Sequence, residues 1–91
     1  MPLVHLEITG RVQGVGFRWF IREHARRSGL AGWVRNRPDG AVEIAAAGTE
    51  ELLTALRNAA RVGPPGATVD QVIERDPSSL ADLPHPFAVL K

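Results

Sequence analysis

A glycine-rich stretch near the start of the chain carries the residues best placed to do chemistry. Three glycines fall within the segment Gly10-Arg11-Val12-Gln13-Gly14-Val15-Gly16, and an arginine follows at position 18. A glycine-rich turn that leads from a strand into a helix gathers unpaired backbone N–H groups and the positive end of the helix dipole, which together favour a bound anion. A lone Gly-x-Gly is also common in ordinary tight turns, so the spacing by itself leaves both interpretations open.

Arg18 strengthens the prediction of an anion site. It is expected in the first turn of a helix, where the macrodipole favours acidic residues and a basic residue costs roughly 0.3–1 kcal/mol. No acidic residue lies between Ile8 and Arg22 to neutralise its charge. The planar guanidinium can donate two parallel hydrogen bonds to phosphate or carboxylate oxygens. We therefore interpret Arg18 as an anion ligand, with a solvated surface residue as the alternative.

Asn36 is the second candidate, because it stands at the end of an expected strand, where asparagine is uncommon. The turn sequence Arg37-Pro38-Asp39-Gly40 follows at once, so a turn-capping side chain explains Asn36 equally well from local sequence. If the strand that starts near Trp33 runs beside the first strand, Asn36 lies near the mouth of the glycine loop.

The elements that must position these residues follow from hydrophobic periodicity. Alternation of apolar and polar residues predicts a strand at 3–9, and helical spacing from Phe17 predicts a helix that Gly29 ends. The other expected elements are a hairpin of strands at 33–36 and 41–45, a helix capped by Thr49 and ended by Gly63, and strands at 68–75 and 87–90. This order predicts an α+β, ferredoxin-like split βαβ fold (βαββαβ) with two helices on one face of an antiparallel sheet.

Composition excludes several classes of site. The 91 residues describe one small domain with 44% hydrophobic residues and a formal net charge of +1. The chain has no cysteine, which excludes disulfides and thiolate catalysis, and His5, His24 and His85 lack metal-ligand spacing. We interpret these histidines as surface or strand-edge residues and expect no metal and no cofactor. Without an export signal or an apolar run of about 18 residues, a cytoplasmic location and no membrane partner are expected.

Other functions share the expected fold. Many RNA-binding domains have this element order and stack bases on strand aromatics, but the strands expected at 3–9 and 41–47 contain none. A non-catalytic anion-binding module is the other alternative, and the presence of both Arg18 and Asn36 favours an enzyme over it. Trp19 is interpreted as helix surface or a lid over the site. A set of charged residues is interpreted as a solvated helical face: Arg22, Glu23, Arg26 and Arg27.

Two segments of the chain closely resemble the signature motifs of acylphosphatases. They are Gly10-Arg11-Val12-Gln13-Gly14-Val15-Gly16-Phe17-Arg18 and Gly32-Trp33-Val34-Arg35-Asn36. The likeness extends over nearly the whole chain, so we expect a single domain of this kind at residues 1–91. The resemblance implies a small, metal-free enzyme that hydrolyses acyl phosphates to a carboxylate and inorganic phosphate. Similar domains also form the N-terminal part of the large carbamoyl-transferring maturation factors of hydrogenases. The absence of zinc-finger cysteines from this sequence favours a free-standing enzyme.

By match of motif, the resemblance also assigns roles to single residues. Arg18 would hold the phosphoryl group with backbone N–H groups of Gln13, Gly14, Val15, Gly16, Phe17 and Arg18, and Asn36 would orient the attacking water. It further implies a small-molecule substrate, with inorganic phosphate as product and inhibitor. We expect no nucleic-acid partner and a monomer, with the oligomeric state left open. A carboxylate leaving group needs no strong general acid, since its parent acid has a pKa of about 4. The tail after Val72 is least typical of the family, so the pairing of segment 76–91 is left open.

Overall fold

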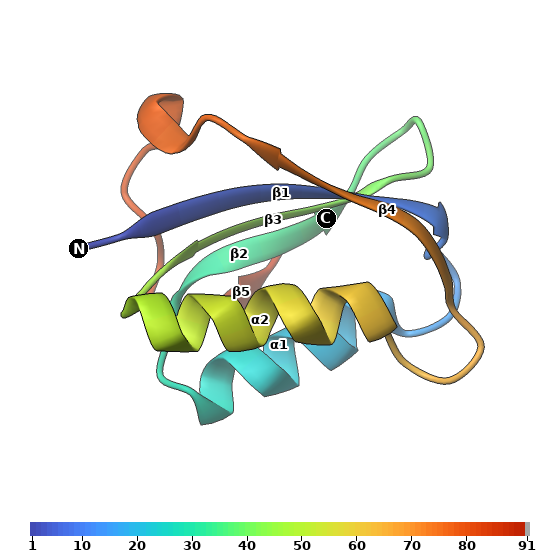
Figure 1. The fold of residues 1–91 in the computed structure, drawn as a ribbon, viewed down its shortest axis with the longest axis horizontal. Helices are drawn as coiled ribbons and strands as arrows, with labels where there is room; N and C mark the ends of the chain where they lie inside the picture. The colour runs from blue at the N-terminus through green and yellow to red at the C-terminus, as the bar shows by residue number, and fades with distance from the viewer. Residues whose placement is uncertain (91) are drawn as a thin grey trace.

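The computed structural model describes residues 1–90 as two helices packed on one face of a five-stranded sheet (Figure 1). The sheet order is β4-β1-β3-β2-β5. The elements in chain order are β1 (Leu3–Arg11), α1 (Phe17–Arg27), β2 (Ala31–Asn36), β3 (Val42–Ala47), α2 (Glu50–Val62), β4 (Thr68–Arg75), the short 3-10 helix η1 (Pro77–Ser79) and β5 (Ala88–Val89). This arrangement confirms the predicted α+β, ferredoxin-like fold.

Strand alternation separates a buried face of the sheet from an open one. On β1, the side chains of Val4, Leu6 and Ile8 are at most 3% exposed and belong to the core, whereas His5 and Glu7 point to the other face. The central strand β3 pairs antiparallel with β1 from Leu3↔Ala47 to Ile8↔Val42. The helices therefore cover the apolar side of this pair.

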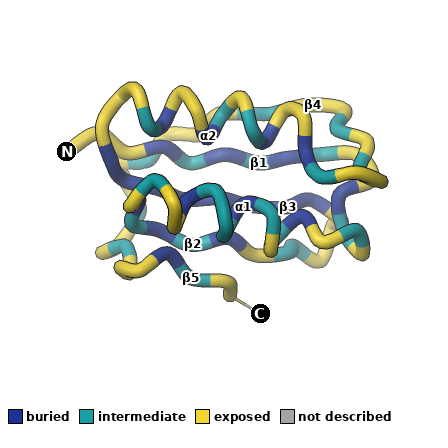
Figure 2. The backbone as a smooth tube through the Cα atoms, turned by 90° about the horizontal axis from the view of Figure 1, so that it is seen from below, coloured by how far each residue is buried: buried dark blue, intermediate teal, exposed yellow. Residues whose placement is uncertain are grey.

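Each helix buries one stripe of side chains against the sheet, and Figure 2 marks buried residues as dark segments of the backbone tube along both helices. The stripes are Phe17, Ile21 and Ala25 on α1, and Leu53, Leu56 and Ala60 on α2. Thr49 caps α2 as predicted, because its side chain accepts a hydrogen bond from the backbone N–H of Leu52 at 3.3 Å.

The expectation that β2 runs beside β1 is wrong, because β3 lies between them. The tight turn at 37–40 makes β2 and β3 hairpin partners, with the N–H of Arg37 donating to the carbonyl of Ala41 at 2.8 Å. Since β3 also pairs with β1, the hairpin places β2 one strand further out.

The C-terminal segment closes the sheet edge next to β2. β5 pairs parallel with β2, and the N–H of Leu90 donates to the carbonyl of Val34 at 2.8 Å, so the sheet is mixed. Phe87 is fully buried, and its carbonyl accepts a hydrogen bond from Arg26 Nε at 2.8 Å. Arg26 is exposed, as predicted for this helical face, and it also makes this one contact, which the sequence did not predict. It ties α1 to the C-terminal segment.

The open face of the sheet carries a network of ion pairs around two facing carboxylates. Glu7 and Glu43 are directly opposite each other on β1 and β3, a pairing that is unfavourable for like charges. Each carboxylate contacts two partners that offset the repulsion: Arg37 at 2.8 Å and Arg75 at 3.1 Å for Glu7, and Arg35 at 2.7 Å and His5 at 2.5 Å for Glu43. His5 is thus mostly buried within the sheet, not the surface or strand-edge histidine expected.

We expect acid to destabilise the fold through these carboxylates. The hydrogen bond from Arg75 lowers the pKa of Glu7, while burial of Glu43 raises its pKa less than the hydrogen bonds from Arg35 and His5 lower it. A carboxyl group with a lowered folded-state pKa adds stability above its unfolded pKa of about 4.3, and this stability is lost as pH falls through the folded value.

Urea unfolding at a series of pH values should therefore show a free energy of unfolding that falls below about pH 4.3. The variant Glu43→Gln should show a shallower acid dependence than the wild type, because one of the two carboxylates no longer titrates. The exposed Glu51→Gln serves as the matched control. An acid dependence equally steep in Glu43→Gln and the wild type would contradict this assignment.

Candidate active site

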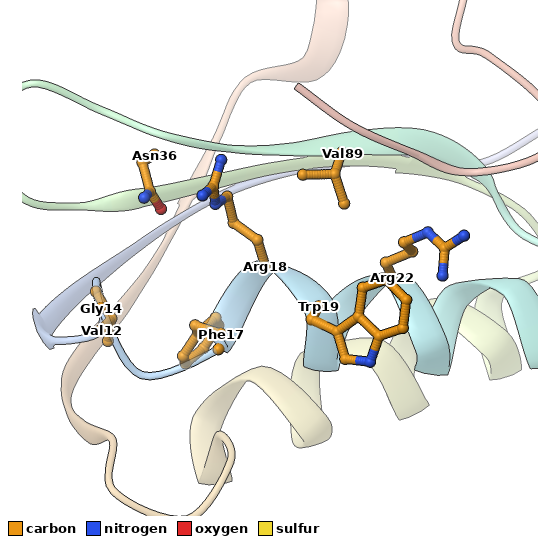
Figure 3. A pocket seen from close by; sticks show the side chains of 9 residues that line it. Val12, Gly14, Phe17, Arg18, Trp19, Arg22, Asn36 and Val89 are labelled. Atoms are coloured by element: carbon orange, nitrogen blue, oxygen red, sulfur yellow. The ribbon is translucent and has the colours of Figure 1, made fainter. Parts of the chain in front are cut away.

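A cleft of about 390 Å³ opens where the glycine loop enters α1 (Figure 3). Its walls come from three parts of the chain: the loop and first turns of α1, the end of β2, and β5. The residues that line it are Val12, Gly14, Gly16, Phe17, Arg18, Trp19, Arg22, Asn36 and Val89. The structure therefore brings Arg18 and Asn36 together with the glycine loop.

The loop presents free backbone donors to this cleft. Gly14 and Gly16 have φ angles of +76° and +78°, the left-handed region that favours glycine, and a Cβ on either would meet no atom within 4 Å. Within residues 1–90, the backbone N–H groups from Gln13 to Arg18 donate to no protein acceptor. The first turn of α1 holds no acidic residue, so the positive end of its dipole is not neutralised.

Arg18 adds a full positive charge to this end of the cleft. Figure 3 shows its side chain between Asn36 and Val89. Its Nη1 donates to the backbone carbonyl of Leu90 at 3.3 Å, and no carboxylate within the described residues 1–90 forms an ion pair with it. A guanidinium held only by one long hydrogen bond keeps donors available for an anion.

Asn36 points toward the same space as a consequence of the strand pleat. Val34 on β2 is buried beneath the helices and Arg35 is on the open face, so the side chain at 36 returns to the helical side. The turn that follows is capped by Asp39, whose Oδ1 accepts from the N–H of Ala41 at 3.0 Å. Among residues 1–90, the Asn36 amide has no hydrogen-bond partner, so a turn-capping role does not account for it.

The loop residues of the predicted site divide into two sets. Gly14, Gly16, Phe17 and Arg18 line the cleft, whereas Val15 packs against the core. Gln13 also lies outside the cleft wall. Its side chain reaches the hairpin and donates from Nε2 to the carbonyls of Arg37 at 2.8 Å and Ala41 at 3.0 Å. Gln13 thereby fastens the glycine loop to the segment that carries Asn36.

Sequence reasoning assigned Arg22 to a solvated face, and the structure corrects this. Arg22 lines the cleft, and its guanidinium carbon is 4.5 Å from the centre of the Trp19 ring. Trp19 lines the cleft as well, with 59% of the residue exposed. The four-residue spacing of Arg18 and Arg22 was the available signal, because residues i and i+4 share one face of a helix.

Within residues 1–90, no group of three or more His, Cys, Asp or Glu side chains is placed to hold a metal ion. No helix in this part of the chain is long and apolar enough to cross a membrane.

Together, the fold and the cleft define a small α+β domain in which a loop of unpaired backbone N–H groups lies beside an arginine and an asparagine. The family model "Acylphosphatase" matches residues 4–88. The acylphosphatase of Thiobacillus denitrificans is 54% identical over 72 residues, which cover 79% of this chain and 81% of that protein. The acylphosphatase of Nitratidesulfovibrio vulgaris is 47% identical over 90 residues, which cover 98% of this chain and 90% of the relative.

A solved structure agrees with these sequence matches. The crystal structure of acylphosphatase from Bacillus subtilis superimposes with a TM-score of 0.91 at 40% identity, over the whole of both chains. The chain belongs to the acylphosphatase family.

The two hydrogen bonds from the Gln13 side chain to the hairpin predict that a Gln13→Ala variant is less stable than the wild type. Gln13→Ala removes two hydrogen bonds, each of which contributes about 0.5–1.5 kcal/mol net, so the free energy of unfolding should fall by about 1–3 kcal/mol in total. Urea unfolding at neutral pH measures this, with the exposed Gln71→Ala on β4 as a matched control. Equal free energies of unfolding for the Gln13 and Gln71 variants would show that the two Gln13 hydrogen bonds do not stabilise the fold.

Proposed function

We propose that this protein hydrolyses the carboxyl-phosphate bond of small-molecule acyl phosphates, producing a carboxylate and inorganic phosphate. The observation that carries the proposal is the meeting of three things in one cleft: a loop of free N–H donors, the guanidinium of Arg18 and the unpartnered amide of Asn36. Membership of the acylphosphatase family supports the same reaction.

The phosphoryl group binds in the loop between Gln13 and Arg18. Backbone N–H groups and the α1 dipole bind its oxygens, and Arg18 exchanges its long contact with the Leu90 carbonyl for the anion. In phosphoryl transfer, charge spreads over the three equatorial oxygens, and catalysis comes mainly from positioning and from donors aimed at that charge. A fixed set of amides and one guanidinium supplies both.

Asn36 positions the attacking water. Its side-chain oxygen accepts a hydrogen bond from the water, which leaves a lone pair of the water oxygen directed at phosphorus. A bond forms between the water oxygen and phosphorus while the bond from phosphorus to the carboxylate oxygen breaks. The carboxylate leaves with the bonding electron pair, and both protons of the water remain with the phosphate as H₂PO₄⁻. No general acid is required, because the carboxylate is a stable anion at neutral pH.

Further properties follow from this arrangement. Inorganic phosphate occupies the same donors as the substrate and is both product and competitive inhibitor. A monomer is the proposed active unit. A non-catalytic anion-binding module is the second candidate, because the loop alone accounts for binding. Measured hydrolysis of an acyl phosphate distinguishes the enzyme from the binding module.

Arg18→Ala should lower the turnover of benzoyl phosphate by roughly a hundredfold or more, the cost of removing one donor positioned for transition-state charge. The assay uses purified protein with a chelator present and follows loss of the acyl phosphate. Arg27→Ala removes the same charge from an exposed position on α1 and serves as the control. Near-normal turnover in Arg18→Ala would refute its role. A folded wild-type protein without turnover would favour the binding module.

Asn36→Ala should lower kcat by on the order of tenfold to a hundredfold and change KM much less, because the water is held for the transition state rather than for substrate binding. Steady-state kinetics with benzoyl phosphate separate the two constants. The exposed Asn58→Ala on α2 is the control for loss of an amide. A rise in KM at constant kcat would instead make Asn36 a substrate-binding residue.

A further inference from the structure

We propose that the end of the cleft formed by Trp19, Arg22 and Val89 is a subsite for the acyl group, and that Arg22 selects acyl phosphates whose acyl chain ends in a carboxylate. The inference rests on the proposed function, since it assigns the second half of the same cleft. It names a substrate class: acyl phosphates of dicarboxylic acids.

The first support is the placement of two cations along one helix. Arg18 and Arg22 both line the cleft and are four residues apart on α1. Four residues of helix advance about 6 Å along the axis and return to the same face. Figure 3 shows Val89 lying over α1 between the two arginines. The cleft therefore offers two positive ends with apolar surface between them.

The second support is that Arg22 is held in place without being neutralised. Its guanidinium lies against the Trp19 ring, with 4.5 Å between the guanidinium carbon and the ring centre. Its one ion-pair contact is Glu23 Oε1 at 3.7 Å, and that carboxylate is 44% exposed, so the pair is weak. The side chain of Arg22 is only 22% exposed, which restricts its conformations.

The neighbouring basic residues of α1 have different surroundings. Arg26 donates to the carbonyl of Phe87 and does not line the cleft, and Arg27 is exposed outside it. Within residues 1–90, Arg22 is thus the one cationic side chain besides Arg18 on the cleft wall.

The chemistry of this end favours a carboxylate over a second phosphate. The N–H-rich loop lies at the Arg18 end, and Arg22 offers a planar fork without surrounding backbone donors. A fork of this kind matches the two oxygens of a carboxylate. With the phosphoryl group in the loop, a short chain of methylene groups along Val89 brings a terminal carboxylate to Arg22. The indole face that an aromatic acyl group would need is occupied by the Arg22 guanidinium.

The test compares succinyl phosphate with butyryl phosphate, which has the same chain length but ends in a methyl group. The wild type should have the higher kcat/KM for succinyl phosphate. In Arg22→Gln the ratio of the two kcat/KM values should fall by roughly tenfold to a hundredfold, the range for losing a charge-assisted hydrogen bond. The change should be mainly in KM for succinyl phosphate. Arg22→Lys should restore part of the preference, and Arg27→Gln should leave the ratio at its wild-type value.

The inference is overturned if the wild type shows no preference, or if Arg22→Gln lowers kcat/KM equally for both substrates. The second result would make Arg22 a structural residue or a ligand of the phosphoryl group. A preference for benzoyl phosphate that disappears in Trp19→Leu would assign the subsite to aromatic acyl groups instead.

A binding measurement keeps this inference separate from the proposed hydrolysis. Calorimetry should show tighter binding of 5-phosphonopentanoate than of pentylphosphonate, which matches it in length and lacks the carboxylate, and Arg22→Gln should remove the difference. Tighter binding without turnover of any acyl phosphate would support the subsite while refuting the proposed function. Equal binding of both phosphonates would refute the subsite.

Discussion

Backbone N–H groups from Gln13 to Arg18 find no acceptor within residues 1–90, because the turn from β1 into α1 takes them out of the hydrogen-bond ladder, and four of these six residues line the cleft. Unpaired donors are costly when they are shielded from water, so the loop is stable only where solvent or an anion reaches it. Gly14 and Gly16 adopt the left-handed backbone angles of this turn without the steric strain that a Cβ would cause. The positions of Arg18, Asn36 and Gln13 are all organised around this loop.

Three segments far apart in sequence have to meet for the cleft to exist. The Gln13 side chain joins the loop to the β2–β3 hairpin, and the hairpin in turn sets the position of Asn36. On the other side, β5 pairs parallel with β2, and Arg26 holds the carbonyl of Phe87. A small domain has limited core to stabilise such a site. The buried stripe of α1 and the burial of Phe87 therefore fix the cleft as well as the fold.

Much of this architecture could be predicted from the sequence, because its signals are local. Alternation marked β1, helical spacing marked α1, and Thr49 was identified as the cap of α2. The pairing of strands that are far apart in the sequence could not be predicted from such local signals. The sequence did not show that β3 separates β1 from β2, or that the C-terminal tail pairs with β2. For the same reason Arg22, Arg26 and Arg27 looked alike, although the structure gives each different surroundings.

The central claim is that the loop donors and Arg18 form one anion site that also includes Asn36. The most direct measurement is a titration of the ¹⁵N-labelled protein with inorganic phosphate, followed by NMR. The account predicts that the backbone amide resonances from Gly14 to Arg18 and the side-chain amide resonance of Asn36 shift along one binding curve. The amide resonances of α2 should keep their chemical shifts. Shifts scattered over the surface, or an undisturbed loop at saturating phosphate, would contradict it.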